Sequence, residues 1–167
     1  MTSLGYRRPL SRRQRVWALV PALLLLLLAL AIVSGQDGGD RFVGAIIPSA
    51  LALIPLGFAL RGHAFAQIDG DTVTVGFRPF WRTQFPVSAL TAVDIVPIDA
   101  WEGHRGWGPK GAPRSPHGQL YSAGGTAGLR FTLADGRRYL VGCDPDTPAA
   151  VRIRDTLAAQ LETKRDA

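Results

Sequence analysis

Two long uncharged stretches near the N-terminus constrain this chain more than any other feature. Residues 16–34 carry no charge and include six consecutive leucines, and residues 42–60 are a second stretch of the same length. Each has 19 residues, which span about 28 Å as a helix, close to the ~30 Å hydrocarbon core of a bilayer. We therefore predict two transmembrane helices, over 16–34 and 42–60, that form a hairpin around the polar turn 35–41.

Two other interpretations of these stretches are weaker. Buried helices of a soluble domain need a polar face, and neither stretch has one. A cleavable signal peptide fits the basic segment before the first stretch, and Val33-Ser34-Gly35 resembles a weak cleavage site. The length of the first stretch and the second one directly after it favour the hairpin.

The distribution of charge predicts the orientation of this hairpin. The formal net charge is +6, of which residues 1–15 carry +5, residues 16–60 carry −1 and residues 61–167 carry +2. Basic residues favour the cytoplasmic side. We expect a multi-pass plasma (inner) membrane protein with both termini in the cytoplasm and a basic cytoplasmic tail over residues 1–15. The nearly neutral remainder argues against a nucleic-acid partner.

The hydrophobic period changes to two after residue 61, which indicates a β-rich domain over residues 61–163. Asp135-Gly136 is a strong hairpin signal, and Thr147-Pro148 is typical of a helix start. Ala150, Ile153, Leu157 and Leu161 follow at helical spacing. We predict strands at 65–68, 72–77, 81–85, 92–98, 129–133 and 138–143, then an amphipathic helix and a short tail at 164–167.

The expected fold class is a membrane α-hairpin plus a β-rich domain. Six or seven antiparallel strands closed by a C-terminal α-helix form an antiparallel β-barrel or sandwich, because the helix covers the apolar face of the sheet. This order of elements is that of a pleckstrin-homology (PH)-like domain. Other small barrels with a terminal helix remain open.

Four segments carry a family resemblance: Asp69–Val75, Phe85–Val93, Arg105–Gly108 and Gly128–Gly142. Through them the chain resembles the bacterial PH-like-domain membrane proteins of the actinobacterial type, in which two N-terminal membrane helices precede a PH-like domain. The resemblance covers about residues 16–162 and implies fold and location. Members mostly lack a known biochemical role, so it implies little about activity. Cys143 stands where many relatives have Thr.

The segment 99–128 is predicted as one long loop with eight glycines and three prolines. Aromatic and basic residues alternate in it, and the candidate contact residues for a partner or a lipid are Trp101, Arg105, Trp107, Lys110 and Arg114. Indole rings and cations suit a headgroup layer, and they equally suit a protein partner or self-association. Alternatively, the tryptophans plug the open end of the barrel.

No residue pattern indicates an enzyme, a cofactor or a metal site. His63, His104 and His117 lack metal-ligand spacing, and Cys143 lies on the strand face of Tyr139 and Val141, as expected of a core residue. Phosphoinositide binding of the eukaryotic PH kind is disfavoured, because the turn Asp69-Gly70-Asp71 would repel phosphate.

The leading hypothesis for function is a non-enzymatic interaction or scaffold module at the cytoplasmic face of the plasma membrane. Its partners would be the lipid bilayer and another membrane protein or a second copy. A self-assembling structural protein and a lipid-headgroup-contacting module acting through residues 101–114 are the alternatives. An enzyme with a site in the long loop would need converging titratable groups.

Overall fold

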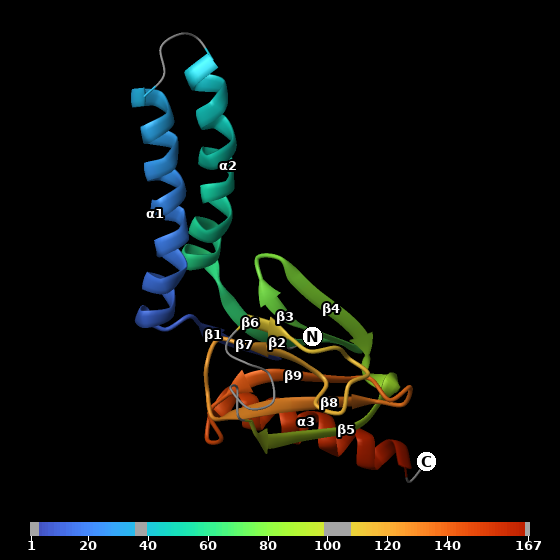
Figure 1. The fold of residues 1–167 in the computed structure, drawn as a ribbon. Helices are drawn as coiled ribbons and strands as arrows, with labels where there is room; N and C mark the ends of the chain where they lie inside the picture. Colours follow the sequence, from blue (N-terminus) through green and yellow to red (C-terminus); the bar gives the residue numbers. More distant parts are fainter. Residues whose placement is uncertain (1–3, 36–39, 99–107, 166–167) are drawn as a thin grey trace. The chain divides into compact units, whose positions relative to one another are not determined.

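The computed structural model describes residues 4–35, 40–98 and 108–165. These residues form two compact units (Figure 1). One is the continuous segment Leu10–Gly62, and the other combines the strand before this segment with the described elements after it. The first unit is therefore an insertion into the second, an arrangement that the sequence did not predict.

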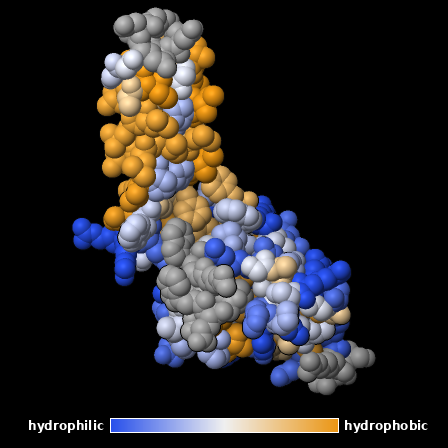
Figure 2. Space-filling model, in the orientation of Figure 1, coloured by the Kyte–Doolittle hydropathy of each residue, from blue (hydrophilic) through white to orange (hydrophobic). Residues whose placement is uncertain are grey.

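The segment Leu10–Gly62 is a hairpin of the helices α1 (Arg12–Gly35) and α2 (Asp40–Arg61). Both helices are long and apolar enough to cross a membrane. The helices predicted over 16–34 and 42–60 are thus confirmed as helices. Large apolar side chains lie exposed along both of them, and Figure 2 shows these side chains over the surface of the hairpin.

Small side chains fill the contact between α1 and α2. The buried side chains of the described hairpin helices are small, namely Ala18, Ala22 and Ala29 on α1 and Ala45, Pro48, Ala52 and Ala59 on α2. At Gly44, an added Cβ would lie 3.2 Å from the Ile32 side chain. Small residues let two helix backbones approach closely, a packing mode of helices in lipid.

The first sheet consists of four antiparallel strands in the order β1-β2-β3-β4. They are β1 (Leu4–Pro9), β2 (His63–Asp69), β3 (Thr72–Arg78) and β4 (Trp81–Pro86). Strand β1 comes before the hairpin and β2 after it, yet they pair along their whole length, from Leu4↔Ile68 to Pro9↔His63.

This pairing corrects the expectation that residues 1–15 form a tail. Residues 4–9 are the edge strand of the sheet, and α1 then begins at Arg12. Tyr6 is buried at 5% exposure, and its hydroxyl donates a hydrogen bond of 3.0 Å to the Gly142 carbonyl. Ser11 and Gln14 form a capping box, because each side chain accepts a hydrogen bond from the other residue's backbone N–H.

The second sheet has five strands in the order β5-β8-β9-β7-β6. They are β5 (Leu90–Pro97), β6 (Gly108–Lys110), β7 (Gln119–Ser122), β8 (Ala127–Leu133) and β9 (Arg138–Cys143). A short 3-10 turn, Val87–Ala89, connects the two sheets. Strands β7 and β9 are parallel, and the other pairs are antiparallel.

Two expectations about the β-rich domain are wrong. The described residues contain nine strands instead of six or seven, and β6 and β7 lie within the segment predicted as one long loop. The two sheets are separate ladders that make a sandwich, so the barrel alternative does not hold for the described part. Glycine and proline hid β6, whose residues are Gly108, Pro109 and Lys110, since both residue types weaken strand patterns.

The core lies between the two sheets. Val73, Val75 and Phe77 of the first sheet are fully buried. The Phe85 ring stacks on Tyr139 of the second sheet with 5.4 Å between centroids and an angle of 15°. Helix α3 (Pro148–Arg165) packs against β5 and β1 and buries the predicted residues Ala150, Ile153, Leu157 and Leu161. The predicted C-terminal helix is therefore confirmed.

Candidate functional site: the outer face of the first sheet

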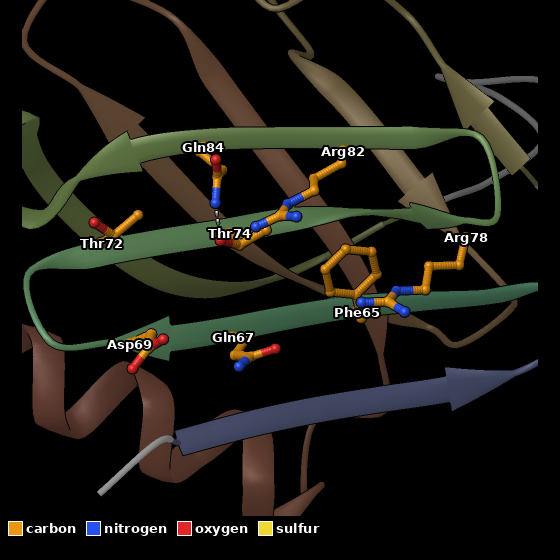
Figure 3. Close-up of a pocket in the computed structure, with 8 residues that line it drawn as sticks. All are labelled: Phe65, Gln67, Asp69, Thr72, Thr74, Arg78, Arg82 and Gln84. Atoms are coloured by element: carbon orange, nitrogen blue, oxygen red, sulfur yellow. Dashed lines mark hydrogen bonds between the residues drawn. The ribbon is translucent and has the colours of Figure 1, made fainter. Parts of the chain in front are cut away.

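The outer face of the first sheet holds a hollow of about 210 Å³, which Figure 3 shows in close-up. Strands β2, β3 and β4 contribute its lining, which is mostly polar. The lining residues are Phe65, Gln67, Asp69, Thr72, Thr74, Arg78, Arg82 and Gln84. Side chains alternate across a strand, so the residues between these point into the sandwich core.

Strand register places these side chains in rows across the sheet. One row runs Arg7, Phe65, Gly76, Arg82, since each is the direct partner of the next. At Gly76 an added Cβ would collide with the Trp81 carbonyl oxygen, so only glycine fits there. No side chain therefore stands between Phe65 and Arg82 in this row.

Arginines gather around Phe65 at one end of the face. The Arg78 guanidinium carbon lies 5.4 Å from the centroid of the Phe65 ring, within range of a cation–π contact. This contact accounts in part for why Phe65, an outward-facing aromatic residue, is only 4% exposed. Arg7 and Arg82 flank Phe65 in its row, and both are exposed.

Acidic and amide side chains occupy the rest of the face. The next row contains Gln67, Thr74 and Gln84, and the Gln84 side-chain amide donates a hydrogen bond of 3.1 Å to the Thr74 hydroxyl. Asp69 lies at the far end, beside the turn to β3. The face is thus polarised along the strands, with cations at one end and a carboxylate at the other (Figure 3).

Among the described residues, the arginines of this face form no ion pair with a carboxylate. Ion pairs found elsewhere in the described part of the chain are Arg8–Asp144, Arg130–Asp94, Arg137–Asp135 and Arg154–Asp155. None of them includes Arg7, Arg78 or Arg82. A guanidinium without a protein carboxylate binds phosphate or carboxylate groups well, because its planar donors match their oxygens.

The described candidates of the long segment, Lys110 and Arg114, do not belong to this face. Trp101, Arg105 and Trp107 lie outside the described residues. Lys110 ends β6 and is half-buried, while Arg114 is exposed in the connection from β6 to β7. Neither Lys110 nor Arg114 lines the hollow.

Burial shifts the pKa of three further titratable groups in the described part of the sandwich. Cys143 is fully buried, and burial raises the pKa of its thiol to about 11, so it stays protonated at neutral pH. Burial also raises the pKa of the Tyr6 and Tyr121 hydroxyls. The described residues contain no group of three or more His, Cys, Asp or Glu that could hold a metal ion.

Sequence reasoning missed this face, although a local signal exists. The run Arg78-Pro79-Phe80-Trp81-Arg82 places two arginines around two aromatic residues in the turn from β3 to β4. Arg7 was assigned to a tail, and only the long-range pairing of β1 with β2 brings it beside Phe65. Comparison of the chain with protein-family models and with curated proteins finds no match.

Proposed function

We propose that this protein is a membrane-anchored interaction module whose helical hairpin spans a bilayer twice. Two features support the anchor: the lengths of α1 and α2, and the large apolar side chains exposed along them. Exposed leucine and isoleucine along a whole helix is unfavourable in water and favourable in hydrocarbon. The sandwich domain is the part available to partners.

The pairing of β1 with β2 is the observation that carries this proposal. Both ends of the hairpin continue into neighbouring strands of one sheet, with Pro9 opposite His63. Within the hairpin, the Leu10 N–H donates a hydrogen bond of 3.3 Å to the Gly62 carbonyl. The two ends must therefore lie on the same side of a membrane, as an even number of spans requires.

The same pairing argues against the signal-peptide alternative. Cleavage near Val33-Ser34-Gly35 would separate β1 from the sheet and remove buried Tyr6 from the core. A segment that contributes an edge strand and a core side chain is a poor candidate for removal. We accordingly retain the first helix as a permanent anchor.

Charge supports a cytoplasmic location of the domain at the plasma membrane. Arg12, Arg13 and Arg15 occupy the first turn of α1, and Arg61 ends α2. Asp37 lies in the connecting segment, and Asp40 begins α2. By the positive-inside rule, the arginine ends of both helices face the cytoplasm. A PH-like assignment of the sandwich rests on the sequence resemblance and belongs to the same proposal.

A non-enzymatic role is the function that this arrangement supports best. The hollow is lined by amides, hydroxyls and arginines, together with Phe65 and, at the far end, Asp69. Its arginine end suits recognition of an anionic group. Anchoring holds such a face at a high effective concentration toward partners in the same membrane. Self-assembly of the hairpin and domain remains the second hypothesis, and analytical size measurement in mild detergent distinguishes a homo-oligomer from a monomer.

Cysteine labelling in intact cells tests the anchor and its orientation. Single cysteines are introduced in a Cys143→Ala background. Gly35→Cys lies at the end of α1, and Glu162→Cys lies at an exposed position of α3. We expect a membrane-impermeant maleimide to label position 35 in intact cells and position 162 only after permeabilisation. Labelling with the opposite pattern would refute the orientation. Release of the protein by alkaline carbonate would refute the anchor itself.

A further inference from the structure

Two exposed aromatic residues stand apart from the rest of the sandwich. Outside the helical hairpin, Phe80 and Trp81 are the large apolar side chains that lie exposed in the described part of the chain, at 53% and 40%. Their rings meet edge to face with 5.6 Å between centroids. The turn from β3 to β4 therefore presents a small apolar surface, flanked in sequence by Arg78 and Arg82.

Strand register places this turn at a defined end of the sheet. Arg78 is the partner of His63 in the β2–β3 pair, and Trp81 is the partner of Phe77. His63 follows the last residue of α2, Arg61, by two positions, a path of at most about 7 Å. Pro9, the other partner of His63, precedes Arg12 of α1 by three positions. At Pro9 and His63, this end of the sheet is therefore the one from which the chain continues into both helices.

The charges of the sheet face agree with this placement. The arginines Arg7, Arg78 and Arg82 lie in the two rows nearest this end, and these rows contain no carboxylate. Asp69 and Asp71 lie at the opposite end, around the turn from β2 to β3. Cations with indole and phenyl rings suit an anionic headgroup layer, whereas carboxylates would be repelled from it.

We propose that the β3–β4 turn, together with Arg7, binds the anionic lipid headgroups of the bilayer that holds α1 and α2. Phe80 and Trp81 lie at the depth of the headgroup–acyl boundary, and the three guanidiniums bind lipid phosphates. This inference rests on the proposed membrane anchor and names the lipid class that the domain contacts. It gives the sandwich a second attachment to the membrane besides its two chain connections.

Quenching of Trp81 fluorescence by brominated lipid tests this contact in the full chain. Trp17, Trp101 and Trp107 are replaced by Phe, and the protein is reconstituted in vesicles of phosphatidylcholine with or without phosphatidylglycerol, with bromine on the acyl chains. We expect quenching at least about twofold stronger in the anionic vesicles, with loss of this excess in 1 M salt. If the triple replacement does not fold, the difference between the native chain and Trp81→Phe reports the same quantity.

Charge variants test which arginines act. Arg78→Gln combined with Arg82→Gln should reduce quenching to the level in pure phosphatidylcholine. The matched control, Arg138→Gln with Lys164→Gln, removes the same charge from exposed positions on β9 and α3 and should leave quenching unchanged. If both double variants lost the same amount of Trp81 quenching, the assignment of the site to Arg78 and Arg82 would be overturned.

The two proposals can fail separately. Flotation of the protein with the vesicles after alkaline carbonate reports insertion of the hairpin. Protein that floats while Trp81 stays unquenched in anionic vesicles overturns the lipid contact and leaves the anchor intact. Protein that does not float overturns the anchor and, with it, the lipid contact.

Discussion

The helical hairpin and the sandwich follow opposite rules for their side chains. On the hairpin helices, the buried apolar side chains are mainly alanines, and most leucines, isoleucines and valines are exposed. In the sandwich, residues such as Val75, Phe131 and Leu157 are fully buried, and Phe80 and Trp81 are the exposed large apolar residues of its described part. Each arrangement is stable only in its own solvent, since water drives large apolar groups inward and lipid does not.

The two units share one chain although their side chains follow opposite rules. Because β1 and β2 pair across the hairpin, the sandwich depends on a strand that lies on the other side of 53 inserted residues, Leu10–Gly62. The helices of the hairpin instead pack through small residues at the contact between α1 and α2, here called the seam, and not through a core of large apolar side chains. Four substitutions probe this division, and the largest effect is expected where β1 enters the sandwich core.

Tyr6→Ala should lower the free energy of unfolding of the sandwich by about 3 to 5 kcal/mol, the usual cost of removing a large buried aromatic side chain. The ring is 5% exposed, and its hydroxyl bonds to Gly142. Tyr6→Phe is the matched control and should cost about 1 kcal/mol. Urea unfolding in mild detergent, followed by fluorescence, measures both. If Tyr6→Ala had the same free energy of unfolding as wild type, β1 would be dispensable for the stability of the sandwich.

Raising the pH should destabilise the sandwich through Cys143. Its pKa is about 11 in the fold against an ordinary 9.0, so the unfolded chain loses this proton first. The stabilising contribution is complete below pH 9 and is lost as the pH rises through 11, at about 3 kcal/mol in total. Cys143→Ala should remove this part of the pH dependence, leaving that of Tyr6 and Tyr121 above pH 10. If the free energy of unfolding fell equally steeply between pH 9 and 10 in wild type and in Cys143→Ala, the burial of the thiol would be contradicted.

Ala52→Leu should destabilise the contact between α1 and α2 by about 1 to 3 kcal/mol, because the larger side chain overfills the seam. Leu53→Ala is the neighbouring control at a 65% exposed position and should leave the contact unchanged. Disulfide formation between Ile32→Cys and Gly44→Cys, in a Cys143→Ala background, reports helix proximity. Equal crosslinking of both variants would argue that the alanines do not form the seam.

The smallest effect is expected at the ion pair that joins β1 to the end of β9. Arg8 and Asp144 lie 2.7 Å apart with side chains 26% and 55% exposed. Such a partly exposed pair contributes less than about 1 kcal/mol and is screened by salt. Arg8→Gln should therefore lower stability slightly at low salt and not at all in 1 M salt. A loss of the size expected for Tyr6→Ala would mean that the pair is far more protected.

Local patterns were sufficient to predict the helices and most strands. The uncharged stretches, the alternation around Val73–Phe77 and the spacing of Ile153 and Leu157 all depend on near neighbours in sequence. Strand β1 could not be predicted, because its partner β2 is more than fifty positions away and its two arginines resemble a charged membrane flank. Strand β7 was missed because it has four residues, too few for a clear alternation, and because its parallel pairing with β9 carries no turn signal.

The candidate site was predictable only in part, for the same reason. The basic and aromatic run Arg78–Arg82 is visible in the sequence, but its position beside Arg7 and Phe65 requires the register of three strands. The tryptophans of the segment 99–128 led to the prediction of a contact site there, but they lie outside the described residues. Sequence patterns therefore favoured residues close together in the chain over residues close together in the sheet.

Removal of the hairpin tests whether the sandwich is assembled from strands on both sides of the inserted segment. Since Pro9 and His63 are paired, an Asn-Gly turn in place of Leu10–Gly62 should close a normal two-residue β-hairpin. We expect this joined chain to be soluble without detergent and to unfold cooperatively in urea, while the chain starting at His63 without β1 is unfolded or aggregates. Equal folding of both chains, or failure of the joined chain alone, would contradict an account in which the sandwich is assembled from both sides of the hairpin.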